Sequence, residues 1–129
     1  MRALLDTQAW LWMDLEPERL TETTRLLLED SYNDLLFSAA SVWEIGLKYA
    51  KGKLPLPVPP RQYVPERMRR HAFIPLAIVP EHAILGSELP RYHRDPFDRL
   101  LVAQAQIERL PIITADPKFR RYDVEVIEA

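Results

Sequence analysis

The chain has 129 residues, of which 47% are hydrophobic and 28% are charged, so it can form one folded domain with a single hydrophobic core. Its formal net charge of −2 excludes a protein that coats nucleic acid through bulk positive charge. The absence of cysteine excludes disulfides, zinc–thiolate sites and thiol nucleophiles. Asp6 would interrupt the apolar part of a signal peptide, and no apolar run approaches the roughly 20 residues of a membrane span. We therefore expect a cytoplasmic protein without a membrane segment.

Short apolar runs alternate with longer helical patterns along the chain. In chain order, the patterns predict a strand at 2–5, helices at 7–13 and 20–31, a strand at 34–39, a helix at 41–52, an irregular proline-rich loop at 53–60, a helix broken by Pro65 at 61–72, a strand at 73–78, helices at 80–89 and 96–110, a strand at 111–115, a helical turn at 116–122 and a strand at 124–127. Strands separated by helices imply right-handed crossovers and a mainly parallel sheet, so we expect an α/β fold.

Each acidic residue beside a predicted helix start has a structural explanation of its own. The predicted roles are an N-cap for Asp6, Asp95 and Asp116, a first-turn position for Asp98, and, for Glu44, a capping box with Ser41 and a helix pair with Lys48. Proline at the first helical position supports the caps at Asp95 and Asp116. Taken singly, these acids need no functional role.

The joint placement of the acids suggests a site. In an open parallel sheet, ligands bind beyond the carboxyl ends of the strands. Asp6, Glu44 and Asp116 lie at or just beyond such ends, and Asp98 begins a helix that can pack beside them. Converging carboxylates repel one another unless a cation compensates, and hard oxygen ligands suit Mg²⁺ or Mn²⁺. The pattern therefore favours metal-assisted phosphoryl transfer.

Four segments carry a resemblance to a known family: MRALLDTQAWLW, SAASVWEIGLKYAKGKL, HRDPFDRLLVAQA and ITADPKF. In order and spacing they resemble the hallmark segments of PIN-domain ribonucleases of the VapC toxin family, and the resemblance covers nearly the whole chain. It implies a single PIN domain over residues 1–129, with a PIN-like three-layer α/β/α architecture and a central, mainly parallel sheet. It also implies a metal-dependent endoribonuclease that acts as the toxin of a toxin–antitoxin pair.

The same resemblance assigns roles to residues. It places the family's catalytic, metal-binding acids on Asp6 in LLDT, Glu44 in SVWE, Asp98 in DPFDR and Asp116 in TAD, with Thr114 as the hydroxyl that orients them. Gln8 departs from the family, where a histidine is common at this position.

The implied reaction is hydrolysis of an RNA phosphodiester bond. An Mg²⁺ or Mn²⁺ ion, held chiefly by Asp6 and Asp98, activates the attacking water, and the products carry a 5′-phosphate and a 3′-hydroxyl. Whether the site takes one ion or two is left open. The implied partners are the RNA substrate, a VapB-like antitoxin whose C-terminal segment blocks the acid pocket, and a second copy of the chain in a homodimer.

Basic, aromatic and histidine residues complete the expectations. Basic residues that can contact the RNA backbone are residues 67–71, Arg91, Arg94, Arg99, Lys118, Arg120 and Arg121. We favour Arg94 and Arg99 for substrate binding, with a structural ion pair as the alternative for Arg99 and a solvated helix face as the alternative for 67–71. We expect Trp43 in the core, and Trp10 and Trp12 on opposite sides of one helix. His71, His82 and His93 are expected at the surface, with His93 near the site.

Other function classes remain as alternatives. A PIN-fold module that binds RNA or protein without catalysis is the main one, although the intact set of acids argues against it. A dehalogenase-type phosphatase needs a second aspartate two residues after Asp6, and Gln8 stands there. A receiver domain needs an early acidic pair that LLDTQ does not supply, and a structure-specific DNA nuclease usually carries additional DNA-gripping segments.

Overall fold

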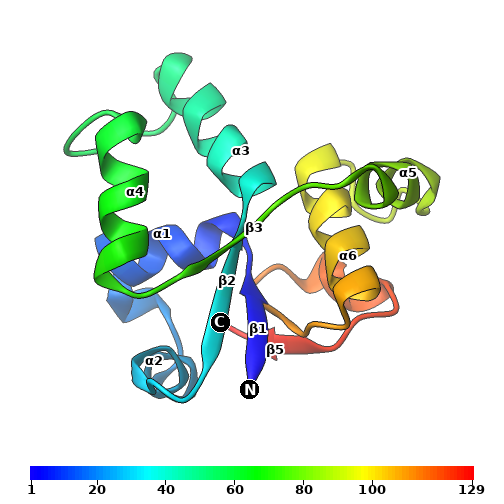
Figure 1. Ribbon diagram of the computed structural model, residues 1–129, viewed down its shortest axis with the longest axis horizontal. Coiled ribbons are helices and arrows are strands. Elements are labelled where there is room, and N and C mark those ends of the chain that lie inside the picture. Colours follow the sequence, from blue (N-terminus) through cyan, green and yellow to red (C-terminus); the bar gives the residue numbers. More distant parts are fainter.

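The computed structural model describes residues 1–129 and is built around a five-stranded sheet in the order β3-β2-β1-β4-β5 (Figure 1). The strands are β1 (Arg2–Leu5), β2 (Asp34–Ser38), β3 (Ile74–Leu76), β4 (Ile112–Thr114) and β5 (Val126–Glu128). All of their pairings are parallel, so the expected α/β fold with a mainly parallel sheet is confirmed.

The helices connect these strands and lie on both sides of the sheet (Figure 1). They are α1 (Thr7–Leu15), α2 (Glu22–Glu29), α3 (Ala39–Ala50), α4 (Pro60–Arg70), α5 (Pro80–Glu88) and α6 (Pro96–Glu108), with short 3₁₀ helices η1 (Pro17–Arg19) and η2 (Pro117–Arg121). None of them combines the length and apolar character that crossing a bilayer requires.

Successive residues of the central strands belong to two different hydrophobic clusters, one on each face of the sheet. Leu5 of β1 and Phe37 of β2 belong to the cluster that also contains Trp10 of α1. Leu4 of β1 belongs to the opposite cluster, with Leu101 of α6. Because successive strand residues point to opposite faces, both faces are buried. In Figure 1, α1, α2 and α4 lie on one side of the sheet and α5 and α6 on the other, so the expected three-layer arrangement is confirmed.

Helix α4 differs from the expectation of a broken helix, because it continues through Pro65. Proline removes one hydrogen bond, to the carbonyl of Arg61 four residues earlier. Both residues are exposed, so water can bind that carbonyl. Tyr63 is buried against the core, and Arg67 Nε lies 3.0 Å from Asp14 Oδ1 on α1. These contacts hold the helix in place on both sides of the proline.

The tryptophans follow the helix geometry. Trp10 is 1% exposed and stacks on Phe37 at a ring separation of 4.3 Å, whereas Trp12 is only partly buried, so the expected difference between them is confirmed. The expectation that Trp43 packs in the core is wrong, because its side chain is 62% exposed. Helix α3 turns Ile45 inward, and the ring of Trp43 meets that of Phe97 edge-on at 5.4 Å.

Candidate active site

The central strands β1 and β4 bring the first and last predicted acids together. The chain runs from β1 outward through β2 and β3, then returns to the other side of β1 through β4 and β5. This reversal makes the carboxyl ends of β1 and β4 a topological switch point, where open α/β sheets bind ligands. Leu5 is in register with Ile113, so Asp6 lies next to Thr114. Asp116 follows two residues later.

A cleft of about 450 Å³ lies at this point of the sheet. The charged residues that line it are Asp6, Glu44, Asp95, Asp98 and Asp116, with Lys48 and Lys53. The structure therefore brings together all four acids singled out in the sequence, from β1, α3, α6 and the turn after β4. It also adds a fifth acid, Asp95, which the sequence indicated only as a cap.

Asp6 caps helix α1 and also lines the cleft. Its Oδ1 accepts a hydrogen bond from the Ala9 backbone N–H at 2.7 Å, which confirms the expected N-cap of α1. Its Oδ2 accepts one from the Thr114 hydroxyl at 2.5 Å. Burial raises the pKa of Asp6 to about 6 despite these two hydrogen bonds, and the charges of Asp116 and Glu44 add to the increase.

Asp98 lies one turn inside α6, after Asp95 has capped that helix by accepting from the Phe97 N–H at 2.8 Å. Burial raises the pKa of Asp98 to about 8, with further increases from the charges of Asp95, Glu44, Asp6 and Asp116. The side chain is still 17% exposed toward the cleft. The two raised carboxyl pKa values thus have the same causes, burial and the repulsion between neighbouring acids. The cleft offers carboxylate oxygens as ligands, and hard divalent cations such as Mg²⁺ prefer oxygen ligands.

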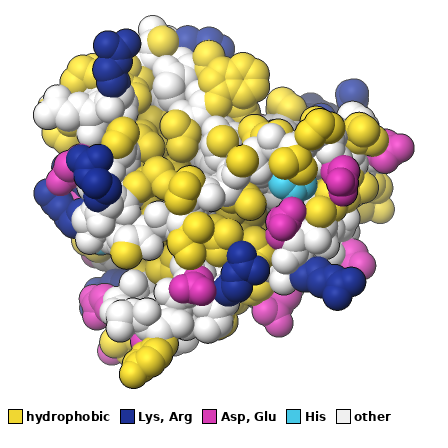
Figure 2. Space-filling model, in the orientation of Figure 1, with side chains coloured by type: hydrophobic (Ala, Val, Ile, Leu, Met, Phe, Trp, Pro, Cys, Tyr) yellow, Lys and Arg dark blue, Asp and Glu magenta, His cyan; other side chains and the backbone are white.

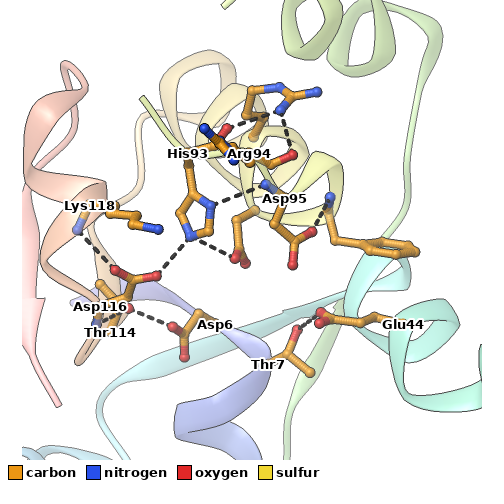
Figure 3. Close-up of polar contacts among 12 residues, drawn as sticks. Asp6, Thr7, Glu44, His93, Arg94, Asp95, Thr114, Asp116 and Lys118 are labelled. Atoms are coloured by element: carbon orange, nitrogen blue, oxygen red, sulfur yellow. Dashed lines mark hydrogen bonds and ion pairs between the residues drawn. The ribbon is translucent and has the colours of Figure 1, made fainter. Parts of the chain in front are cut away.

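Thr114 and Asp116 connect the end of β4 to Asp6 and to a histidine (Figure 3). The Thr114 hydroxyl, which donates to Asp6, accepts from the Asp116 N–H at 3.0 Å. Asp116 caps η2 by accepting from the Lys118 N–H through Oδ1 at 2.9 Å, as expected for a cap before Pro117. Its Oδ2 lies 2.7 Å from His93 Nε2. Thr114 thus connects the Asp6 carboxylate to the backbone of Asp116, and the Asp116 carboxylate contacts His93.

Glu44 is 4% exposed and has partners on both carboxylate oxygens. Oε1 accepts from the Thr7 hydroxyl at 2.7 Å, and Oε2 pairs with Lys48 Nζ at 2.6 Å, which confirms the expected helix pair. The expected capping box with Ser41 is wrong, because α3 begins earlier and Ser38 caps it through its hydroxyl. Ser41 instead lies inside the helix, with its Oγ 2.8 Å from the Thr7 hydroxyl.

Lys48 brings a positive charge to the mouth of this cleft. Burial lowers the pKa of Lys48, but the hydrogen bond to Glu44 and the charges of Glu44, Asp95 and Asp98 outweigh that effect, so the pKa is raised overall. Its side chain is 52% exposed and can reach a bound anion. Sequence spacing had identified Lys48 only as a helix partner of Glu44.

The arginines divide into structural and free groups. Arg99 Nη1 donates to the carbonyls of His93 and Arg94, each at 3.0 Å, so the structural alternative is favoured for Arg99, through backbone carbonyls rather than an acid. Arg94 is exposed on the same loop. Arg67 pairs with Asp14 and also with Glu66, so it is held by acids of this protein, a role that neither RNA contact nor a solvated helix face describes.

Two histidines expected at the surface are buried. His82 is 1% exposed and His93 is 7% exposed. His93 lies beside the candidate site, as its position before DPFDR suggested. Its burial could not be predicted from the spacing of residues in the sequence. Its Nε2 is 2.9 Å from Asp98 Oδ2 and 2.7 Å from Asp116 Oδ2.

The fold and the cleft define a doubly wound α/β protein with a carboxylate cluster at the switch point of its sheet. The family model of the PIN domain matches residues 3–125. The chain belongs to the PIN domain family.

Comparison with individual proteins agrees with this assignment. The chain is 50% identical over 60 residues to Ribonuclease VapC16 of Mycobacterium tuberculosis, a match that covers 46% of this chain and 41% of that protein. The match therefore spans less than half the length of this relative.

Two solved structures share the fold. In the crystal structure of VapBC2 from Rickettsia felis bound to a DNA fragment from their promoter, the matched chain is 16% identical, with a TM-score of 0.71 and coverage of 98% of both chains. In FitAcB from Neisseria gonorrhoeae, the identity is 24% and the TM-score 0.63, with coverage of 99% of this chain and 97% of that chain. At these identities the likeness concerns the fold alone.

Proposed function

We propose that this chain, as a single PIN domain, is an endoribonuclease that acts as the toxin of a toxin–antitoxin pair and requires a divalent cation. The observation that carries the proposal is the meeting of Asp6, Glu44, Asp98 and Asp116 in one cleft at the switch point of the sheet. Membership of the PIN domain family and the local identity to Ribonuclease VapC16 support the reaction and the substrate class.

Asp6, Asp98 and Asp116 would hold the cation, Mg²⁺ or Mn²⁺, through oxygens that face the cleft. When bound, such an ion supplies an activated water and neutralises charge on a phosphate. Glu44 already has Thr7 and Lys48 as partners, so we place it at the edge of this site. Thr114 fixes the direction of the Asp6 carboxylate.

The residues at the mouth of the cleft would bind the RNA backbone. Lys48 approaches the acids closely enough to bind a phosphate oxygen beside them, and Arg94 is exposed next to the loop that leads to Asp98. Attack by water on the phosphorus, with departure of the 3′-oxygen, gives a 5′-phosphate and a 3′-hydroxyl.

The proposed protein partners are a VapB-like antitoxin and a second copy of the chain. Two solved neighbours in fold are the VapBC2 and FitAcB structures. Hydrophobic side chains gather in the middle of the face drawn in Figure 2. The exposed large apolar residues include Ile78 and Val79, between β3 and α5, and Ile84 in α5. Such surface is typical of a protein that binds another chain.

The proposal is tested by incubating labelled single-stranded and structured RNAs with the purified protein in Mg²⁺, in Mn²⁺ and in EDTA. We expect cleavage with either metal, none in EDTA, and 5′-phosphate ends on the products. Asp6→Asn is the inactive control, because it keeps the shape of the N-cap and removes the charge. A folded protein that binds metal and RNA but cleaves none of these RNAs would support the non-catalytic binding module instead.

Lys48→Met is expected to lower kcat/KM for RNA cleavage by about 100-fold, an effect typical for removal of one charged group that stabilises a transition state. The substitution keeps the length of the side chain and removes the cation from the mouth of the cleft. Rates are measured under single-turnover conditions at saturating Mg²⁺. Lys51→Met, an exposed lysine at the end of the same helix, is the matched control and should retain full activity. Equal rates for the two variants would remove Lys48 from the mechanism.

A further inference from the structure

We propose that His93 is a positioning residue of the metal site, where its Nε2–H holds the Asp116 carboxylate and keeps it beside Asp98. The inference rests on the proposed function, because it assumes that the acid cleft binds a divalent cation. The site then includes His93 in addition to the four acids and Thr114. His93 does not touch the ion, and its role is to orient Asp116, the acid on the turn after β4.

The backbone of His93 is fixed from two directions. Its N–H donates to the Tyr122 hydroxyl at 2.9 Å, and that hydroxyl in turn donates to the Pro90 carbonyl at 2.5 Å. Its carbonyl accepts from Arg99 Nη1 at 3.0 Å. The ring packs edge-on against Phe119 with a centroid distance of 5.6 Å. A ring held in this way keeps Nε2 at one fixed point beside Asp98 and Asp116, two acids that line the cleft.

The hydrogen bonds also define the tautomer. Nδ1 accepts from the Asp95 backbone N–H at 3.3 Å, which requires a free electron pair on that nitrogen. In a neutral imidazole the proton then lies on Nε2. Nε2 is 2.7 Å from Asp116 Oδ2 (Figure 3), and it is 2.9 Å from Asp98 Oδ2. With the proton on Nε2, His93 donates a hydrogen bond to Asp116 Oδ2, the nearer of the two carboxylate oxygens.

His93 contacts two acids that come from different parts of the chain, Asp98 on α6 and Asp116 after β4. Asp116 stands on a short turn and receives its other side-chain hydrogen bond from the Lys118 N–H. Asp98 stands on α6, and its Oδ2 approaches the same nitrogen of His93, 2.9 Å from Nε2. Carboxylates that ligate metals are oriented by such outer hydrogen bonds, and loss of one typically weakens metal binding by about 10–100-fold. The same loss is expected when the His93 donor is removed.

His82 provides a matched control within the chain. It is also buried, its Nδ1 accepts from the Val79 N–H at 3.1 Å, and its Nε2 lies 2.9 Å from Glu108 Oε2. Like His93, it therefore has a backbone donor at Nδ1 and a carboxylate at Nε2, but with one carboxylate in place of two. His82 lies on α5, outside the acid cleft.

The test measures Mn²⁺ binding to the full chain by the loss of the electron paramagnetic resonance signal of free Mn²⁺. The matched variants are His93→Gln and His93→Met, which are similar in length but differ in the N–H donor. We expect a Kd about 10–100-fold weaker than wild type for His93→Met, and a Kd closer to wild type for His93→Gln. His82→Met should unfold more easily than wild type yet bind Mn²⁺ as wild type does. His93→Leu replaces His93→Met if the latter does not fold.

The outcomes separate this inference from the proposed function. Wild-type affinity in His93→Met, or equal losses in the Gln and Met variants, would overturn the positioning role while leaving the metal site intact. A loss of affinity in His82→Met equal to that in His93→Met would also overturn it, because the effect would then reflect stability alone. If the wild-type chain itself bound no Mn²⁺, the metal-dependent function would fail, and the inference with it.

Discussion

Replacement of Asp98 by asparagine is expected to reduce metal-dependent RNA cleavage by about a thousandfold, which corresponds to roughly 4 kcal/mol of transition-state stabilisation. The Asp98→Asn substitution keeps the shape of the side chain but removes the charge that holds the cation. It is also expected to raise the free energy of unfolding of the metal-free protein at pH 8. The reason is that the pKa of Asp98 is about 8 in the folded protein, so ionising it there costs stability.

Activity and stability therefore change in opposite directions, which a general loss of folding would not produce. The measurement is a pair of experiments at pH 8: single-turnover cleavage with Mg²⁺, and urea unfolding in EDTA. Asp123→Asn, a change to an exposed acid outside the cleft, is the control and should alter neither quantity. Retained cleavage in Asp98→Asn would exclude Asp98 as a metal ligand.

The stability of the metal-free protein is expected to fall as the pH rises from 5 to 9. The pKa values of Asp6 and Asp98 are raised from 3.8 to about 6 and about 8, respectively. The folded state therefore keeps protons that the unfolded chain has already released, and this stabilisation is lost as the pH rises through the two folded-state values. Allowing for the partial exposure of Asp98, we expect a loss of about 2–3 kcal/mol.

Saturating Mg²⁺ should remove most of this loss, because an ion that binds only the folded state stabilises it and replaces the protons as counter-charge. Urea unfolding at pH 5, 7 and 9, with EDTA or with Mg²⁺, measures both effects. In Asp98→Asn the dependence on pH should be much weaker, even in EDTA. An unfolding free energy that stays constant with pH in the metal-free wild type would contradict the account of the cluster given above.

The sheet and the meeting of the acids at its edge could be predicted from local patterns, whereas the roles expected of the acids came from the family resemblance. Short apolar runs separated by helices determine a parallel sheet, and parallel strands end at the same edge. Asp6 and Asp116 follow two such runs directly, so their meeting required only that β1 and β4 be neighbours. The caps at Asp6, Asp95 and Asp116 are equally local, since each acid binds an N–H two or three residues ahead.

The remaining features depend on how the elements pack. Ser38 caps α3 in place of Ser41 because the helix begins where β2 ends, and two serines in one segment gave no local means of choosing between them. Trp43 is exposed because the inward face of α3 is set by its contacts with α1 and α6. The position of His93 depends on hydrogen bonds with Tyr122 and Arg99, which lie 29 and 6 residues away in the chain. Only the folded structure reveals such contacts.

The hydrogen bond between Thr114 and Asp6 joins residues that are 108 positions apart in the chain. Along the chain, β1 comes long before its sheet neighbour β4 and the turn that carries Asp116. A chain that ends before this turn lacks one wall of the cleft and the hydroxyl that orients Asp6. The cleft can therefore form only in a chain long enough to include β4 and the Asp116 turn, and a shorter chain has no complete acid cluster.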